Sequence, residues 1–185
     1  MKLKELMQNT NKQMPHLYLD MDGVQADFFG AWAAKNNVGN YKEIPDTETS
    51  INELASSSPL EVYKFFRELQ PLKGGGRVVQ WLNQHNIPYT VLSAPLRGPY
   101  AEASVGAKKD WLDEHNPNAT QNAIFTQHKH KYALNNGEPN VLVDDYGKYL
   151  NHWTNAGGIA VKHEDGNTQH TIAELEKIYA PYITR

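Results

Sequence analysis

Short apolar segments alternate with helical segments along most of this chain, and this rhythm constrains its fold more than any other feature. The expected strands cover residues 16–20, 88–92, 124–125, 140–143 and 158–161. Several of these runs are apolar throughout and lack the alternation of a strand with one wet face, so they are typical of a parallel sheet covered on both faces. We therefore predict an α/β fold, a Rossmann-like arrangement of three α/β/α layers around a parallel sheet.

Helical spacing of apolar residues appears between the expected strands. The expected helices cover residues 25–36, 60–69, 76–86, 100–115, 147–156 and 171–180, with a helical turn within 128–135. The polar N-terminal stretch of residues 1–15 reads as a short helix or a loose tail. Residues 39–59 are rich in Asn, Pro, Ser, Thr and Asp, which predicts a loop with little regular structure.

One long segment interrupts the regular alternation of strands and helices. Residues 27–75 contain no expected strand, so we predict a small α-helical cap inserted after the first strand. Residues 1–26 and 76–185 would then form the core. The run of three glycines at 74–76 follows no strand and lacks the Gly-Lys-Ser/Thr ending of a phosphate loop. We predict a turn there, which could act as a hinge between cap and core.

Length and composition limit the possible classes of function. A chain of 185 residues suits one domain, and a formal net charge of -3 argues against a protein that coats extended nucleic acid. The absence of cysteine excludes disulfides, thiolate metal sites and a cysteine nucleophile. No apolar run reaches the roughly 18 residues of a membrane span, and the N-terminus lacks the apolar core of a signal peptide. We expect a cytoplasmic protein with no membrane partner, and the sequence leaves open whether it is a monomer or a homodimer.

Polar side chains follow three of the expected strands. Asp20 and Asp22 follow the first strand, Ser93 follows the second, and Asp144 and Asp145 follow a later one. In an open α/β sheet, ligands bind outside the carboxyl ends of the strands, so these side chains should meet at one edge. Carboxylates held close together repel one another and favour a bound cation, and oxygen ligands suit Mg²⁺.

This set of groups has the chemistry that phosphoryl transfer needs. Asp20 can attack phosphorus and form an aspartyl-phosphate, while Asp22 can protonate the leaving oxygen and later activate water. Ser93 and the backbone amides of the turn at 21–24 can hold phosphate oxygens, and Gly23 allows the backbone to approach closely. A lysine from the cationic segment 128–131 can neutralise the charge of the transition state.

Four stretches of the chain resemble the motifs of the haloacid dehalogenase superfamily. They are DMDGV at 20–24, SAP at 93–95, a later lysine, and VLVDDYGK at 141–148. The closer similarity is to the 5′(3′)-deoxyribonucleotidases, including phage and bacterial relatives. That family is similar in the DMDGV-x-ADF stretch through Phe28, in a segment like FFRELQPLKGG at 65–75, and in a lysine-containing helix that ends in Trp111. The resemblance spans roughly residues 16–163.

The resemblance implies a Mg²⁺-dependent phosphatase with an aspartyl-phosphate intermediate. The metal would be held by Asp20, the Asp22 carbonyl and Asp144, with Asp145 beside them. Ser93 and a lysine would complete the catalytic group. The implied contacts to a nucleoside monophosphate are Gly23, Phe28, Ala94, Lys108 and Lys131, with Phe65 and Phe66 as weaker matches for stacking on the base.

The identity of the catalytic lysine remains open in the sequence. Lys129 fits the Thr-x-x-Lys pattern that begins at Thr126, but 15 residues separate it from Asp144. Lys131 is nearer, and both cannot have one role. The position where the family has an arginine, just before that lysine, is Gln127 here, which changes the expected contacts to substrate.

Three functions are compatible with these residues. The first is a nucleotidase for deoxyribonucleoside monophosphates. The second keeps the chemistry but acts on sugar phosphates or on the 3′-phosphate ends of nucleic acid. The third is a non-catalytic nucleotide-binding protein with the same fold. The third has no chemical need for Asp20, Asp22, a lysine and both late aspartates together, so we favour an enzyme.

Overall fold

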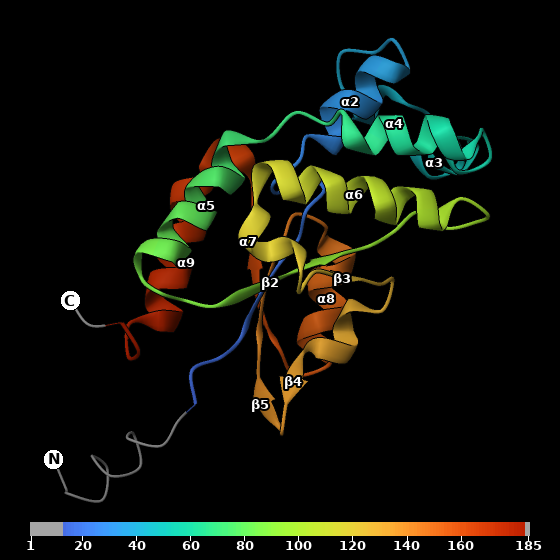
Figure 1. The fold of residues 1–185 in the computed structure, drawn as a ribbon. Helices are drawn as coiled ribbons and strands as arrows, with labels where there is room; N and C mark the ends of the chain where they lie inside the picture. The colour runs from blue at the N-terminus through green and yellow to red at the C-terminus, as the bar shows by residue number, and fades with distance from the viewer. Residues whose placement is uncertain (1–12, 184–185) are drawn as a thin grey trace, which may run out of the picture.

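A parallel sheet forms the centre of the molecule in a computed structural model that describes residues 13–183 (Figure 1). Its strands, in spatial order, are β3 (Ile124–Phe125), β2 (Tyr89–Ser93), β1 (Leu17–Leu19), β6 (Val141–Asp144) and β7 (Ile159–Lys162). Every neighbouring pair is parallel. The predicted strands are therefore confirmed to within one or two residues. Residues 1–12 of the polar N-terminal stretch lie outside the described residues.

The register of the sheet brings the strand ends to one edge. Leu19 of β1 lies level with Val91 of β2 and with Val143 of β6. The amide of Asp20 donates to the Val143 carbonyl at 2.9 Å, which extends the ladder by one residue. The side chains that follow β1, β2 and β6 consequently lie at the same, carboxyl edge of the sheet.

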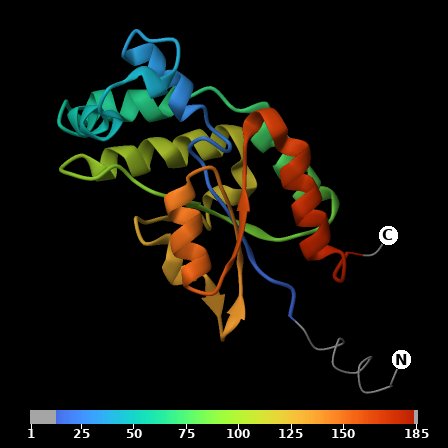
Figure 2. The ribbon, with the colours of Figure 1, turned by 180° about the vertical axis from the view of Figure 1, so that it is seen from behind.

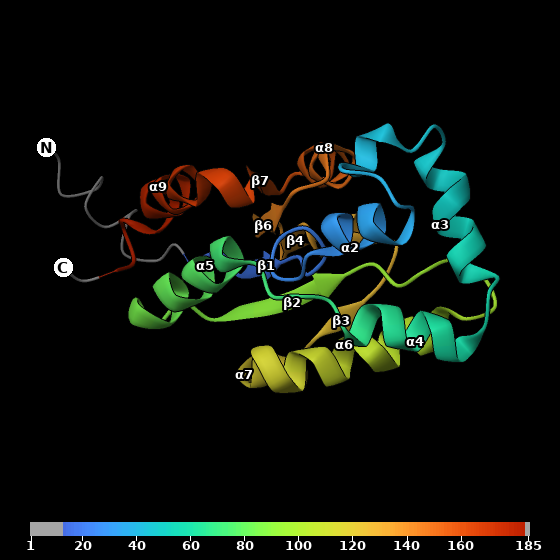
Figure 3. The same ribbon diagram turned by 90° about the horizontal axis from the view of Figure 1, so that it is seen from above.

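Helices cover both faces of the sheet, as predicted (Figure 3). On one face, α5 (Lys73–Gln84) and α9 (Thr168–Tyr179) share an apolar cluster with β1 and β6. The same face of β2 packs against α6 (Ala101–His115) and α7 (Pro117–Thr120). On the other face, α8 (Gly147–Asn155) and the short helix η2 (Lys129–Tyr132) cover Tyr18, Leu92 and Leu142.

The segment between β1 and α5 is helical and lies at the end of the molecule toward which β1 runs (Figures 1 and 2). Its elements are α2 (Phe28–Lys35), η1 (Tyr41–Glu43), α3 (Thr47–Ala55) and α4 (Pro59–Arg67). The prediction of a loop over 39–59 is wrong, because α3 occupies nearly half of it. The Asp46 side chain accepts a hydrogen bond from the Thr49 amide at 3.0 Å and caps the start of this helix. At the other end of the helix, Leu54 and Ala55 are buried in the core.

This helical segment shares its core with α6. The Trp111 indole donates to the Leu69 carbonyl at 2.7 Å, and Arg67 pairs with Glu114 at 2.5 Å. Phe66 is buried in the same cluster as Trp111. The apolar core thus runs from the sheet into α4 without a break, and a separate cap over 27–75 remains a prediction.

Gly74, Gly75 and Gly76 belong to the first turn of α5, so the prediction of a turn at these residues is wrong. Gly74 and Gly75 are buried. The amide of Gly74 donates to Asp165 Oδ1 at 2.7 Å, and a Cβ on Gly75 would collide with the Val24–Gln25 backbone, 2.8 Å from Gln25 Cα. The glycines let α5 begin against the loop that follows β1.

Residues 128–135 contain η2, as the predicted helical turn requires, but the segment ends in a hairpin. Strands β4 (Leu134–Asn135) and β5 (Glu138–Pro139) pair antiparallel at the end of the molecule opposite α2 to α4 (Figure 2). Asn136 and Gly137 connect them with φ of 51° and 84°. Asn-Gly is the common sequence for a two-residue hairpin turn, so the sequence did contain this signal. Among the described helices, none has both the length and the apolar character needed to cross a membrane.

Candidate active site

Three carboxylates that follow β1 and β6 come together at the carboxyl edge of the sheet. One oxygen each from Asp20, Asp144 and Asp145 can be chosen so that all lie within 4.8 Å of one another. Asp20 is 5% exposed and Asp144 is fully buried. The amide of Tyr146 donates to Asp144 Oδ1 at 2.8 Å and fixes this carboxylate at the start of α8. The sheet register therefore produces the cluster that the strand-end residues predicted.

Lys129 lies between two of these carboxylates. Its Nζ is 2.7 Å from Asp20 Oδ1 and 2.7 Å from Asp144 Oδ2, and the side chain is almost wholly buried. The ammonium also lies 4.6 Å from the centre of the Tyr149 ring. Burial alone would lower the pKa of Lys129, but the charges of Asp20 and Asp144 outweigh it and raise the pKa. The lysine is therefore positively charged across the physiological range.

The carboxyl groups of Asp144 and Asp145 hold their protons more tightly than ordinary carboxyls. Burial, and then the charge of Asp20, raise the pKa of Asp144 to about 7 against the opposing effect of Lys129. Burial, followed by the charges of Asp20 and Asp144, raises the pKa of Asp145 to about 8. One ammonium does not offset three neighbouring carboxylates, so the cluster favours a further cation.

A second buried lysine binds the other predicted catalytic groups. Lys108 Nζ donates to Asp22 Oδ2 at 2.6 Å, to Ser93 Oγ at 2.9 Å and to the Ala94 carbonyl at 2.6 Å. Lys108 and Ser93 are fully buried. Burial raises the pKa of the Asp22 carboxyl, although the charge of Lys108 opposes this. Asp22, Ser93, Ala94 and Lys108 thus form one hydrogen-bonded group beside Asp20.

The turn that follows Asp20 is held by contacts that the sequence did not reveal. Gly23 has φ of 75°, and a Cβ there would lie 2.6 Å from Asp145 Cγ, so glycine makes room for that carboxylate. The Gly23 amide donates to the Ala26 carbonyl at 2.8 Å. The buried Gln25 amide donates to the Asp20 carbonyl at 2.9 Å and accepts from Asn116 at 2.8 Å. A glutamine or an asparagine is usual at a surface, so its residue type alone does not signal this role.

The aromatic residues near the first motif gather beside Lys108. Phe28 is only 6% exposed and packs among Trp32, Phe65 and Phe66. The ring of Phe66 is centred 4.9 Å from Lys108 Nζ. Phe29 and Phe65 are half-buried and border the same cluster. Phe28 therefore has little exposed surface for stacking on a base. The exposed aromatic surface of this cluster belongs to Phe29 and Phe65.

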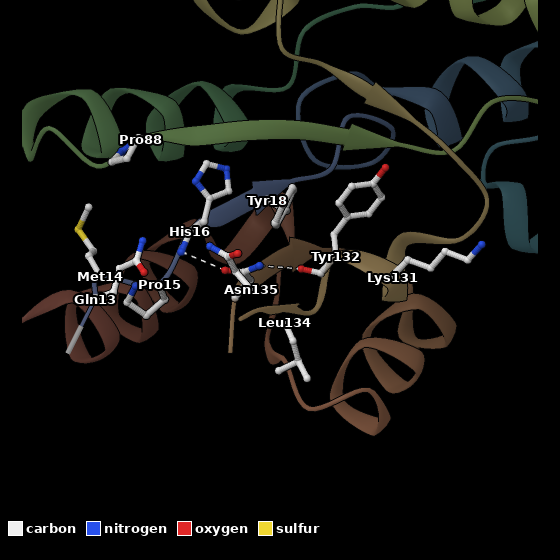
Figure 4. A pocket seen from close by; sticks show the side chains of 11 residues that line it. Gln13, Met14, Pro15, His16, Tyr18, Pro88, Lys131, Tyr132, Leu134 and Asn135 are labelled. Carbon is white, nitrogen blue, oxygen red and sulfur yellow. Dashed lines mark hydrogen bonds between the residues drawn. The ribbon is translucent and has the colours of Figure 1, made fainter. Parts of the chain in front are cut away.

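Lys131, the alternative to Lys129, lies outside the carboxylate cluster. It is exposed and lines a cavity of about 620 Å³ together with His16, Pro88 and Asn140 (Figure 4). His16, Pro88 and Asn140 immediately precede β1, β2 and β6, so this part of the cavity lies at the amino edge of the sheet. Gln127 donates to the Pro95 carbonyl and accepts from the Tyr149 hydroxyl at 2.9 Å, which connects the loop after β3 to α8.

The residues present fit a Mg²⁺ ion. The donors are all carboxylate oxygens and lie close enough for one ion to reach, and burial followed by neighbouring negative charge raises the pKa of Asp144 and of Asp145. Asp20 and Asp144 are carboxylates that would hold the ion, with Asp145 beside them.

Mg²⁺ should stabilise the protein more at high pH than at low pH. Because the folded-state pKa values of Asp144 and Asp145 exceed the unfolded value of about 3.9, the metal-free protein loses stability as the pH rises from about 4 through 8. Mg²⁺ competes with those protons, so its effect on Tm should grow between about pH 6 and pH 9. Thermal unfolding in Mg²⁺ and in EDTA across this range measures the difference. Asp145→Asn should reduce it, and a difference that does not change with pH would contradict the assignment.

Comparison with known proteins identifies one family. A family model described as 5′ nucleotidase, deoxy (Pyrimidine), cytosolic type C protein matches residues 13–175. A solved HAD hydrolase, family IA, variant 3, from Entamoeba histolytica HM-1:IMSS is 15% identical, with 89% of each chain covered and a TM-score of 0.47. A solved dehalogenase is 11% identical, with 94% of this chain and 99% of that chain covered and a TM-score of 0.46. No curated protein matches the chain significantly.

Proposed function

This chain belongs to the 5′ nucleotidase, deoxy (Pyrimidine), cytosolic type C family, and from that premise we propose that it is a Mg²⁺-dependent 5′(3′)-deoxyribonucleotidase that hydrolyses nucleoside monophosphates. The family model covers most of the chain, including every residue that follows the strands at the carboxyl edge. It confirms the resemblance to the deoxyribonucleotidases and makes the protein a phosphatase. The metal, the intermediate and the substrate are the parts that we propose.

One observation carries the proposal. Lys129 bridges Asp20 to Asp144, and Lys108 holds Asp22, two residues after Asp20, beside Ser93. A nucleophile, an acid, a hydroxyl donor and fixed positive charge therefore meet at one edge of the sheet. This is the set of groups that phosphoryl transfer through a covalent intermediate requires.

In the first half-reaction, a carboxylate oxygen of Asp20 attacks phosphorus and the bond from phosphorus to the ester oxygen breaks. Asp22 gives its proton to that oxygen, so the nucleoside leaves as an alcohol. The raised pKa of Asp22 supports this role, because the carboxyl is more readily protonated than an ordinary one. Lys129 stabilises negative charge next to Asp20 as the phosphoryl group arrives.

In the second half-reaction, the Asp22 carboxylate takes a proton from water, and the water oxygen attacks phosphorus. The bond between phosphorus and Asp20 breaks, inorganic phosphate leaves, and both carboxyl groups return to their starting states. Asp20, Asp144 and the Asp22 carbonyl would hold Mg²⁺, with Asp145 beside them. When bound, the ion supplies positive charge that offsets the phosphoryl oxygens.

We assign the base-binding role to the helical segment 27–75, as a small cap over the carboxyl edge. Its aromatic residues lie next to Lys108, and Phe29 and Phe65 keep part of their surface accessible. An aromatic ring stacks on any base, so this cluster supports a preference for nucleotides over sugar phosphates.

A panel of phosphate esters tests the proposal. We expect phosphate release from 5′- and 3′-deoxyribonucleoside monophosphates in Mg²⁺, and loss of release in EDTA, because the carboxylate cluster lacks compensation without the ion. Sugar phosphates and oligonucleotides with a 3′-phosphate complete the panel. Release from sugar phosphates or 3′-phosphate ends alone would preserve the chemistry but overturn the substrate. Nucleotide binding without any release from folded, Mg²⁺-loaded protein would favour a non-catalytic role.

A further inference from the structure

Lys108 is a buried, hydrogen-bonded lysine to which the proposed reaction assigns no step. It is 0% exposed, and its ammonium donates to three acceptors: Asp22 Oδ2, Ser93 Oγ and the Ala94 carbonyl. An ammonium has three hydrogens, so these bonds use its whole donor capacity. Lys108 therefore has no donor left for a phosphate oxygen, although the sequence suggested that it contacts substrate.

The bond from Lys108 determines which way the Ser93 hydroxyl can act. Ser93 Oγ accepts from the ammonium at 2.9 Å, so its own hydrogen has to point away from Lys108. The structure gives the hydroxyl no other acceptor among the described residues. The hydroxyl hydrogen is thus free to donate to a phosphoryl oxygen, while its lone pair is occupied.

Lys108 also makes the two oxygens of Asp22 unequal. Oδ2 accepts from Lys108 at 2.6 Å, whereas Oδ1 is covered and accepts no hydrogen bond from the described residues. The bond to Lys108 fixes the rotation of the carboxyl group. Oδ1 is consequently the Asp22 oxygen that no described residue engages, which leaves it for proton transfer with a bound substrate.

We propose that Lys108 is a positioning residue, which orients the Asp22 carboxyl for proton transfer and the Ser93 hydroxyl for donation to phosphate without touching the substrate itself. The inference rests on the proposed function, because it assigns Lys108 a part in that reaction. It also explains why a lysine occupies this place on the buried face of α6, next to Phe66. A side chain with one or two donors could not orient all three acceptors.

Two esters with different leaving groups test this role in Lys108→Met. A nucleoside monophosphate needs a proton on its departing alkoxide, whereas p-nitrophenyl phosphate has a leaving group that departs without one. We expect kcat/KM to fall on the order of 100-fold or more for the nucleotide and at least about tenfold less for the nitrophenyl ester. The double variant Asp22→Asn/Lys108→Met should lose clearly less than the product of the two single losses, because both changes disable the same proton transfer.

Lys109→Met is the matched control, since Lys109 is the exposed neighbour on α6 and should keep wild-type kinetics. Lys108→Gln should lose less activity than Lys108→Met, because its amide can still donate to Asp22. If Lys108→Met does not fold, Lys108→Gln takes its place in the comparison of the two esters. An equal loss for both esters with a raised KM would show direct phosphate contact and overturn the inference. So would wild-type kinetics in a folded Lys108 variant. A wild-type protein that hydrolyses neither ester would instead overturn the proposed function, and the inference with it.

Discussion

Asp20→Asn should lower kcat on the order of 10⁴-fold or more and leave the protein folded. The amide is nearly the same size as the carboxylate but does not attack phosphorus, so the covalent route is lost. The change also removes one of three neighbouring negative charges, so the metal-free protein should not lose much stability. Steady-state phosphate release from a deoxyribonucleoside monophosphate, with thermal unfolding of both proteins, measures the two effects.

The control for this variant is Asp113→Asn, because Asp113 is an exposed aspartate on α6, away from the carboxyl edge. We expect wild-type turnover there. A more direct test is to trap phosphate on the protein by rapid acid quenching with labelled substrate. Label should appear on wild-type protein and be absent from Asp20→Asn. Turnover near the wild-type rate in Asp20→Asn would remove Asp20 as the nucleophile.

Lys129→Met should cost both activity and stability. The side chain is buried between Asp20 and Asp144, so its loss leaves two carboxylates facing each other without a counter-charge. Breaking a buried ion pair by removing one partner typically costs about 3–5 kcal/mol. We also expect kcat to fall on the order of 10³-fold, because a fixed positive charge beside the nucleophile is lost. Mg²⁺ should restore part of the Tm, since it returns positive charge to the cluster, but not the turnover.

Lys131→Met is the comparison that decides between the two lysines. Lys131 is exposed and lies outside the carboxylate cluster, so its removal should change the free energy of unfolding by less than about 0.5 kcal/mol and leave kcat unaltered. Chemical denaturation and phosphate release on both variants provide the measurement. A large loss of turnover in Lys131→Met, with little in Lys129→Met, would reverse the assignment.

The parallel sheet could be predicted because its physical cause is local. Strands buried on both faces are apolar throughout, and β6 shows this in Val141, Leu142 and Val143, all of which are buried. The polar residue that follows such a run marks its carboxyl end. Since parallel strands align their ends, Asp20, Ser93 and Asp144 could be expected at one edge before any contact was known.

The helical segment after β1 was harder to predict because its stability comes from distant contacts. Helix α3 is mostly polar, and what holds it is the Asp46 cap and the burial of Leu54 against the rest of the core. The glycines at 74–76 are a similar case. In most sequences they break a helix, but here the close approach of α5 to Val24 and Gln25 requires them.

The sequence by itself determined the sheet, its order of polar strand ends and the kinds of chemical group at the candidate site, because residue type and spacing carry that information. Only the tertiary structure decided which lysine serves which carboxylate. Lys129 and Lys131 are two residues apart, yet one is buried between Asp20 and Asp144 and the other is exposed outside the carboxylate cluster. Lys108 reaches Asp22 across 86 residues of chain. Such pairings depend on how η2 and α6 pack against the sheet, and a local sequence pattern does not contain that packing.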